Sequence, residues 1–168
     1  MSNVRRQMLI DNALVTLREI TAATVGSIIC LSVSEKQKSF VASNAVSLAQ
    51  ALFAPEAWYR AIYLAGEPAG FVMLEDESLL ASAPESPQAS VWRFMIDAKF
   101  QGQGIGKAAL LQVIEHVRNK RIFKALRLSY VPGPGCPEPF YLSIGFRHTG
   151  EIEGNEVVLE IPLHYGDA

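Results

Sequence analysis

Apolar and polar residues along this chain alternate between the two-residue period of strands and the wider period of helices. Seven segments alternate or form short apolar runs between turn residues, and they are predicted to be strands: 14–20, 58–64, 69–74, 91–96, 124–130, 147–152 and 156–162. Helical spacing predicts four helices: 21–30, 44–53, a long one containing 110–119, and 137–144. The resulting order is β-α-α-β-β-β-α-β-α-β-β.

The second helix and the segment 75–90 carry more detailed predictions. The helix is predicted to begin with Asn44 as its cap and to turn Val46, Ala49 and Phe53 inward. The segment 75–90 begins with three acidic residues and contains two prolines, so we expect a mobile loop. It is not a domain boundary, because neither side of it could bury its own sheet.

The glycine-rich stretch 100–108 separates two kinds of sequence. The apolar run 91–96 before it is typical of a buried strand, and the helical pattern after it places the apolar residues of 110–117 on one face. Glycine lets a ligand approach the backbone, and the first amides of a helix have no partner within the helix. A strand, a glycine turn and a helix start together predict a phosphate-binding site.

Two common phosphate-binding motifs do not fit this stretch. A Walker A loop requires Gly five residues before Gly106 and Ser or Thr after Lys107, where the chain has Gln101 and Ala108. A Rossmann fingerprint requires its third Gly at Lys107. The pattern that remains is Gln-x-x-Gly-x-Gly, directly after an apolar strand that ends in Asp97. An ordinary glycine turn between strand and helix is the alternative.

Composition narrows the class of protein. A chain of 168 residues with 49% hydrophobic and 19% charged residues is expected to form one compact domain, residues 1–168. The net charge of −2 and the lack of long basic clusters argue against nucleic-acid binding. Cys30 and Cys136 are far apart, so we expect neither a disulfide framework nor a metal site. No long apolar run follows the first residues, so we expect no membrane span and a cytoplasmic location.

The glycine motif and the order of elements resemble the GCN5-related N-acetyltransferase (GNAT) family. The resemblance covers nearly the whole chain and is strongest over 92–150. Two stretches, 37–49 and 92–97, resemble the bacterial branch that includes spermine/spermidine acetyltransferases. The family implies an α/β (α+β) GNAT fold. This is a single mixed, twisted sheet of about seven strands with helices on both faces, in which strands four and five splay around coenzyme A.

The resemblance also implies that acetyl-CoA is the co-substrate and suggests where it binds. Main-chain groups of Met95 and Ile96 are expected to bond the pantetheine and the acetyl group. The pyrophosphate is expected at the loop amides, namely those of Gln101, Gly102, Gln103, Gly104, Ile105, Gly106 and Lys107. The Lys107 side chain either adds charge to this site or is an ordinary solvated lysine.

Tyr141 is the candidate catalytic acid. It lies in Phe140-Tyr141-Leu142-Ser143-Ile144-Gly145-Phe146, which resembles a family motif whose Tyr commonly protonates the departing thiolate. A phenol with a pKa near 10 keeps its proton at neutral pH and can donate it. A tyrosine that only packs is the alternative. Many members have Asn seven residues earlier, where this chain has Pro134, so that coenzyme A contact is expected to be absent or made elsewhere.

The general base is less evident from the sequence. Polyamine acetyltransferases often carry an acidic residue early in strand four, where this chain has Trp92, Arg93 and Phe94. Glu75 is the candidate base, acting directly or through water, and Glu19 is another. As a group, three carboxylates are the candidate binding site for a cationic acceptor: Glu75, Asp76 and Glu77. For each of them alone, a solvated loop charge is the alternative.

The sequence therefore predicts an acetyl-CoA-dependent N-acetyltransferase that acylates a primary amine, such as a polyamine, by direct attack in a ternary complex. Protein N-terminal or lysine acetylation is the alternative acceptor class, and an acyl-CoA-binding sensor with weak turnover is the alternative to an efficient enzyme. Cys136 lies in a proline-rich loop with no His near it in sequence, so an acyl-cysteine is not expected. Family members often form homodimers, and no nucleic-acid or membrane partner is expected.

Overall fold

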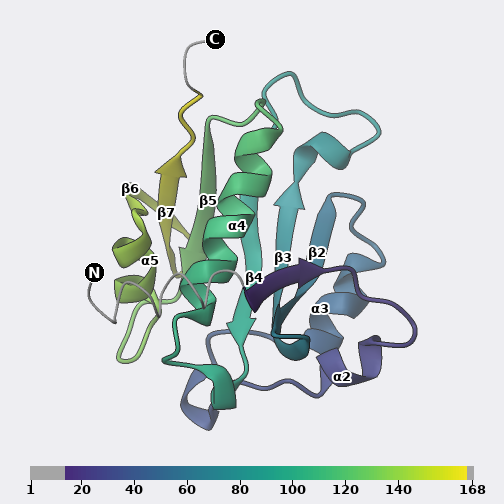
Figure 1. Cartoon of the computed structure of the whole chain (residues 1–168). Helices are drawn as coiled ribbons and strands as arrows, with labels where there is room; N and C mark the ends of the chain where they lie inside the picture. The colour runs from purple at the N-terminus through teal and green to yellow at the C-terminus, as the bar shows by residue number, and fades with distance from the viewer. Residues whose placement is uncertain (1–13, 166–168) are drawn as a thin grey trace, which may run out of the picture.

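Seven strands form one sheet within residues 14–165, the part of the chain that the structure, a computed structural model, describes (Figure 1). The strands are β1 (Val15–Arg18), β2 (Ala57–Leu64), β3 (Glu67–Asp76), β4 (Ala89–Ile96), β5 (Ala125–Tyr130), β6 (Arg147–Glu153) and β7 (Glu156–Pro162). Their order in the sheet is β1-β2-β3-β4-β5-β7-β6, and only β4 and β5 are parallel neighbours. The predicted mixed sheet is confirmed.

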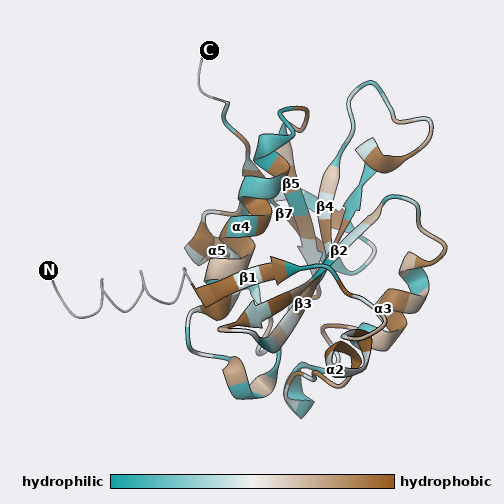
Figure 2. Ribbon diagram, turned by 45° about the vertical axis from the view of Figure 1, so that its right-hand side comes forward, coloured by the Kyte–Doolittle hydropathy of each residue, from teal (hydrophilic) through white to brown (hydrophobic). Residues whose placement is uncertain are grey.

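Four α-helices flank the sheet in the described residues. They are α2 (Val25–Ile29), α3 (Asn44–Ala51), α4 (Ile105–Asn119) and α5 (Glu138–Ile144). The helices α4 and α5 lie on one side of the sheet, and α2 and α3 lie on the other (Figure 2). The order of helices and strands is the predicted one. The helix α2 begins later than predicted, because 21–24 forms a turn in which the Thr24 amide donates to the Thr21 carbonyl at 3.0 Å.

Each face of the sheet has its own apolar cluster. The larger cluster takes Leu110, Val113, Ile114 and Val117 from α4, which are at most 2% exposed, as their helical spacing predicts. The smaller cluster packs α2 and α3 against the other face. Side chains of β3 alternate between the two clusters. Val72 and Leu74 belong to the larger one, and Phe71 and Met73 belong to the smaller one.

The face that α3 turns inward differs from the prediction. Val46 is 49% exposed, Phe53 is 88% exposed, and Ala49 is exposed as well, so the prediction that these three point inward is wrong. The cap is Ser43, whose hydroxyl accepts a hydrogen bond from the Val46 amide at 3.3 Å. Asn44, the predicted cap, is instead the first helical residue.

Two small polar residues occupy the buried positions of α3. Asn44 is 1% exposed, and its Nδ2 donates to the Ile28 carbonyl at 2.9 Å. Ser47 is fully buried, and its hydroxyl donates to the Ser43 carbonyl at 3.1 Å. Because hydrogen bonds to the main chain let these polar side chains lie inside the fold, the inward face could not be found from apolar spacing alone.

The loop between β3 and β4 is shorter than predicted. Glu75 and Asp76 belong to β3, a 3₁₀ turn follows at Glu77–Leu79, and β4 begins at Ala89. The two ends of the loop are joined, because the Glu77 amide donates to the Gln88 carbonyl at 3.1 Å and the Gln88 amide donates to Glu77 Oε2 at 2.7 Å. This pair holds the start of β4 beside the end of β3.

Strand β4 contains the irregularity that opens the sheet. Met73 pairs with Arg93 and Leu74 pairs with Val91, so Trp92 is an extra residue in β4, as in a β-bulge. The parallel pairing of β4 with β5 extends only as far as Val91. Beyond that residue the two strands diverge (Figure 1), which confirms the splayed strands expected from the resemblance.

Gly70 of β3 lies close to the splayed half of β4. A Cβ at Gly70 would be 2.4 Å from the Met95 carbonyl oxygen, so a side chain there would displace the main chain of β4. We expect Gly70→Ala to lower the free energy of unfolding by about 1–3 kcal/mol, measured by urea denaturation. The matched control is Gly26→Ala in α2, where nothing lies within 4 Å and stability should be equal or higher. Equal stability of the two variants would contradict this close approach.

Candidate active site

The separated strands β4 and β5 form the walls of a cleft of about 1410 Å³. Strand β4 contributes residues 90–96, and β5 contributes residues 127–130. Its other sides are lined by the start of α4, the helix α5, the segment 37–42, the end of β6 and the start of β7. Sites for drug-sized ligands usually measure roughly 300–1,000 Å³, so this cleft has room for a large ligand together with a second molecule.

The glycine loop closes one end of the cleft. Gly104 is the N-cap of α4 with a φ of +82°, and Gly102 has a φ of +74°. Residues with a Cβ rarely adopt these conformations. The first hydrogen bond of α4 runs from the Ala108 amide to the Gly104 carbonyl at 3.1 Å. The amides of residues 105–107 precede it and have no partner within the helix, so they can bind an anion.

Two glutamines brace this loop. Gln101 Nε2 donates to the Ile96 carbonyl at 2.9 Å and to Gln37 Oε1 at 3.0 Å. Gln103 Nε2 donates to the Lys99 carbonyl at 3.2 Å, and Gln103 does not line the cleft. The other predicted coenzyme A residues all line it: Met95, Ile96, Gln101, Gly102, Gly104, Ile105, Gly106 and Lys107. Lys107 is exposed, and no salt bridge within residues 14–165 includes it.

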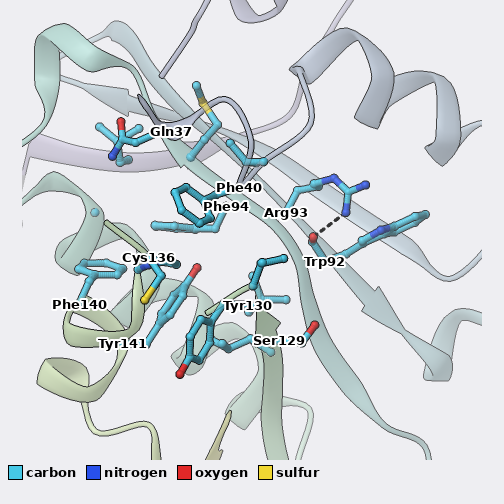
Figure 3. A pocket seen from close by; sticks show the side chains of 18 of the residues that line it. Gln37, Phe40, Trp92, Arg93, Phe94, Ser129, Tyr130, Cys136, Phe140 and Tyr141 are labelled. Carbon is cyan, nitrogen blue, oxygen red and sulfur yellow. Dashed lines mark hydrogen bonds between the residues drawn. The ribbon is translucent and has the colours of Figure 1, made fainter. Parts of the chain in front are cut away.

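The Tyr141 side chain extends from α5 into the cleft (Figure 3). It is 8% exposed, and its ring packs against Phe140 and Phe146 with centroid distances of 5.3 and 5.9 Å. Burial raises the pKa of Tyr141 to about 12. Its hydroxyl has no hydrogen-bond partner in residues 14–165 and is directed into the cleft, where a ligand can accept its proton.

Tyr130 is a second tyrosine in the cleft with a different environment. Its hydroxyl points away from Tyr141 and donates to Glu138 Oε1 at 2.5 Å (Figure 3). Burial, followed by this hydrogen bond, raises the pKa of Tyr130 to about 12. Because its proton is already shared with a carboxylate, Tyr130 offers a natural comparison for Tyr141.

Carboxylates line the cleft outside the glycine loop. Glu75 accepts a hydrogen bond from the Ser90 hydroxyl at 3.2 Å, and Glu156 accepts one from the Ser129 hydroxyl. Five glutamates line the cleft in all: Glu56, Glu75, Glu77, Glu153 and Glu156. No salt bridge within residues 14–165 involves any of them. Four cationic side chains also line the cleft, but none of them forms a salt bridge with these glutamates: Lys38, Arg93, Lys107 and Arg127. The carboxylates therefore remain available to a cationic ligand.

Asp76 does not belong to this acidic group. It is 1% exposed, forms an ion pair with Lys120 at the C-cap of α4, and accepts a hydrogen bond from the Ser78 amide at 3.0 Å. Successive residues of a strand point to opposite faces, so Glu75 faces the cleft while Asp76 faces α4. The prediction that Asp76 binds a cationic acceptor is therefore wrong.

Several residues of the cleft were not in the predicted set. Glu156 and Ser129 meet through the pairing of β7 with β5, and the segment that contains Gln37 and Phe40 lies against β4. These neighbours depend on the order of strands in the sheet, which the sequence pattern does not provide. Of the cleft residues that were not predicted, only Arg93 stands out in the sequence, because it is a charged residue inside an otherwise apolar strand.

Comparison with known proteins gives the family. A sequence model described as "Acetyltransferase (GNAT) family" matches residues 24–135, more than half of the chain. The chain belongs to the GNAT acetyltransferase family. It is an acetyl-CoA-dependent N-acetyltransferase, which acts on an amine.

Individual relatives of this GNAT protein agree with that result. A spermine/spermidine N(1)-acetyltransferase of Bacillus subtilis (strain 168) is 29% identical over 147 residues, which cover 84% of this chain and 93% of that protein. Among solved structures, the acetyltransferase from Salmonella typhimurium that modifies the N-terminal serine of protein L7/L12 has a TM-score of 0.69 at 15% identity and covers 90% of this chain and 96% of its own. A PaiA N-acetyltransferase from Thermoplasma acidophilum in complex with coenzyme A has a TM-score of 0.64 at 16% identity, covering 88% and 98%. These structures show the fold.

Pro134 stands where the resemblance described above leads us to expect Asn. Pro134 is exposed and does not line the cleft, whereas the neighbouring residues Gly135, Cys136 and Pro137 do.

Within residues 14–165, no three His, Cys, Asp or Glu side chains gather as a metal site requires. In the same range, no helix is long and apolar enough to cross a membrane.

The glycine loop can be tested by a matched pair of substitutions. Gly104→Val places a β-branched residue at a φ of +82°, which should distort the loop and remove the anion-binding amides. We expect the affinity for acetyl-CoA to fall by about tenfold or more, measured by calorimetry. Gly66→Val is the control, because Gly66 has a similar φ of +87° in the β2–β3 turn and does not line the cleft. Equal affinities of the two folded variants would contradict the pyrophosphate assignment.

Proposed function

We propose that this GNAT enzyme acetylates a primary amine of a polyamine. The observation that carries the proposal is the set of five unpaired glutamates in the cleft: Glu56, Glu75, Glu77, Glu153 and Glu156. A polyamine is a flexible polycation at neutral pH, and carboxylates that line a cleft favour its binding. The similarity to a spermine/spermidine N(1)-acetyltransferase over most of the chain supports the same acceptor.

The donor lies along the splayed half of β4. Met95 and Ile96 line the cleft beyond the last residue of β4 that pairs with β5, and their main chain is expected to bond the pantetheine and acetyl groups. Met95 also pairs with Phe71 of β3, and the Ile96 carbonyl also accepts a hydrogen bond from Gln101 Nε2. The pyrophosphate takes the free amides of residues 105–107, and Lys107 adds a positive charge beside them. The acyl group then lies in the same cleft as Tyr141 and the glutamates.

The reaction is direct transfer in a ternary complex. Glu75 takes a proton from the acceptor ammonium, directly or through water, and the neutral amine attacks the thioester carbonyl. The C–S bond breaks as the amide forms, and Tyr141 donates its proton to the departing sulfur. The attacking nitrogen loses its second proton in the same step, and that proton restores the Tyr141 phenol, directly or through water. The raised pKa of Tyr141 keeps that proton in place throughout the physiological pH range.

Two single substitutions separate the base from a binding carboxylate. Loss of a general base lowers kcat, whereas loss of a binding charge raises KM and leaves kcat nearly unchanged. We expect Glu75→Gln to lower kcat for spermidine by about 10²- to 10⁴-fold. We expect Glu156→Gln to raise KM and to weaken its dependence on salt. Release of the coenzyme A thiol is measured for both.

The control for this pair is Glu85→Gln, a carboxylate in the exposed part of the β3–β4 loop that does not line the cleft. It should leave kcat and KM unchanged. An amine panel that contains spermine, spermidine, a lysine peptide and a peptide with a free N-terminus gives the decisive comparison. If the peptides are acetylated and the polyamines are not, or if KM ignores both salt and Glu156→Gln, the polyamine assignment fails.

Tyr141→Phe tests the acid while keeping the ring and its packing. We expect kcat to fall by about 10²- to 10⁴-fold, with the affinity for acetyl-CoA changed by no more than about threefold. Because the folded-state pKa is about 12, the phenol loses its proton only as the pH rises through that value. Tyr141 should therefore cause no decline of kcat between about pH 7 and 10.

Tyr130→Phe is the matched control for Tyr141→Phe. It removes a hydroxyl from the same cleft, but one that is already hydrogen-bonded to Glu138. We expect a small loss of stability and a kcat close to that of the wild type. If Tyr141→Phe also turns over at the wild-type rate, water or another group supplies the proton.

A further inference from the structure

Trp92 is the one residue of β4 between Ala89 and Ile96 that pairs with neither neighbouring strand. The pairing with β3 passes from Val91 to Arg93, and the pairing with β5 ends at Val91. Trp92 therefore lies outside the regular ladder, at the point where the cleft begins. An unpaired carbonyl inside a sheet needs another donor, or the strand will shift to find one.

The Arg93 side chain supplies that donor. Its Nη1 donates to the Trp92 carbonyl at 2.9 Å, and its Nη2 donates to Gln50 Oε1 in α3 at 3.2 Å. Figure 3 shows the Arg93 side chain beside Trp92 on the wall of the cleft, with its bond to the Trp92 carbonyl. The planar guanidinium can hold two acceptors in fixed directions, so it ties the bulge of β4 to a helix on that face.

The surroundings of Arg93 are unusual for an ion-pairing arginine. Burial lowers its pKa, while Glu156 and Glu75 oppose that change, yet no carboxylate in residues 14–165 lies within 4 Å of its guanidinium. Its Nε is buried without a partner. The side chain thus bonds the bulge and α3 rather than the nearby glutamates, and it leaves those carboxylates free for a ligand.

We propose that Arg93 is a positioning residue, which holds the bulge of β4 so that the main chain of residues 93–96 stays apart from β5 and aligned with the donor. This inference rests on the proposed function only in its kinetic test, because kcat must be measured with an acceptor amine. Arg93 touches neither reacting group in this role. Its loss should misplace the β4 main chain without disturbing the glycine loop, which lies beyond the end of that strand.

The test compares Arg93→Ala with Arg127→Ala. Arg127 also lines the cleft, but its side chain pairs with Glu151 of β6 and makes no contact with the bulge. We expect Arg93→Ala to lower kcat by about 10- to 100-fold, with the dissociation constant for coenzyme A changed by less than about threefold. Guanidinium ion at low millimolar concentration should restore part of the lost rate, because it can occupy the vacated site. Arg127→Ala should lower kcat by a clearly smaller factor than Arg93→Ala, because Arg127 does not hold the bulge.

Two further variants distinguish fixed hydrogen bonding from charge alone. Arg93→Lys keeps the charge but cannot bond two acceptors in one plane, so it should remain impaired at least about fivefold. Gln50→Ala removes only the anchor in α3 and should lower kcat by a smaller factor than Arg93→Ala. If Arg93→Lys is as active as the wild type, or if Arg93→Ala matches Arg127→Ala, the positioning role is refuted.

Hydrogen exchange gives a readout that does not depend on activity. In Arg93→Ala and Gln50→Ala, amides of residues 91–96 should exchange faster, while amides of β3 residues 67–70 should not change. Unchanged exchange in Gln50→Ala would overturn the inference even if Arg93→Ala does not fold. If the wild type acetylates no polyamine but these exchange differences appear, the acceptor assignment fails and the positioning role stands.

Discussion

The early end of the pairing between β4 and β5 is the constraint on which the site depends. Two parallel strands in the middle of a sheet would normally bond along their whole length, because buried main-chain groups need partners. Here the pairing stops at Val91, and an extra residue, Trp92, disrupts the register with β3 as well. The result is a cleft through the centre of the sheet, with free main-chain groups on its wall. The close approach of Gly70 to the Met95 carbonyl and the bond from Arg93 to Trp92 keep this half of β4 in place.

Once the strands separate, the two ends of the cleft differ in their chemistry. The glycine loop provides unpaired amides and Lys107, which suit the phosphates of a nucleotide-like donor. Glutamates from three separate parts of the chain provide the negative potential that suits a cationic acceptor. Tyr141 lies in the same cleft, and its hydroxyl is directed into the cleft without a hydrogen-bond partner in residues 14–165. The two ends of the cleft therefore suit two different substrates. The glycine loop suits an anionic donor, and the glutamates suit an amine, which is cationic at neutral pH.

Much of this arrangement could be predicted because it is local in sequence. The apolar run of β4, the glycine loop and the apolar face of α4 follow one another within about 30 residues, and short-range backbone preferences decide their conformations. The motif around Tyr141 is equally compact, and the structure places Tyr141 in the cleft. The inward face of α3 was mispredicted, because Asn44 and Ser47 are buried through hydrogen bonds that apolar spacing does not reveal.

The sequence by itself determined the order of elements, the glycine loop at the start of α4 and the presence of acidic residues near the end of β3. Only the tertiary structure decided which of those acids face the cleft. Glu75 and Asp76 are adjacent in sequence, but the pleat of β3 sends Glu75 into the cleft and Asp76 to Lys120 behind the sheet. The register of β7 with β5 places Glu156 in the site, and the bulge in β4 places Arg93 there. The strands β5 and β7 are separated in sequence by α5 and β6, so the residue pattern within either strand does not show which residues of the other lie beside it.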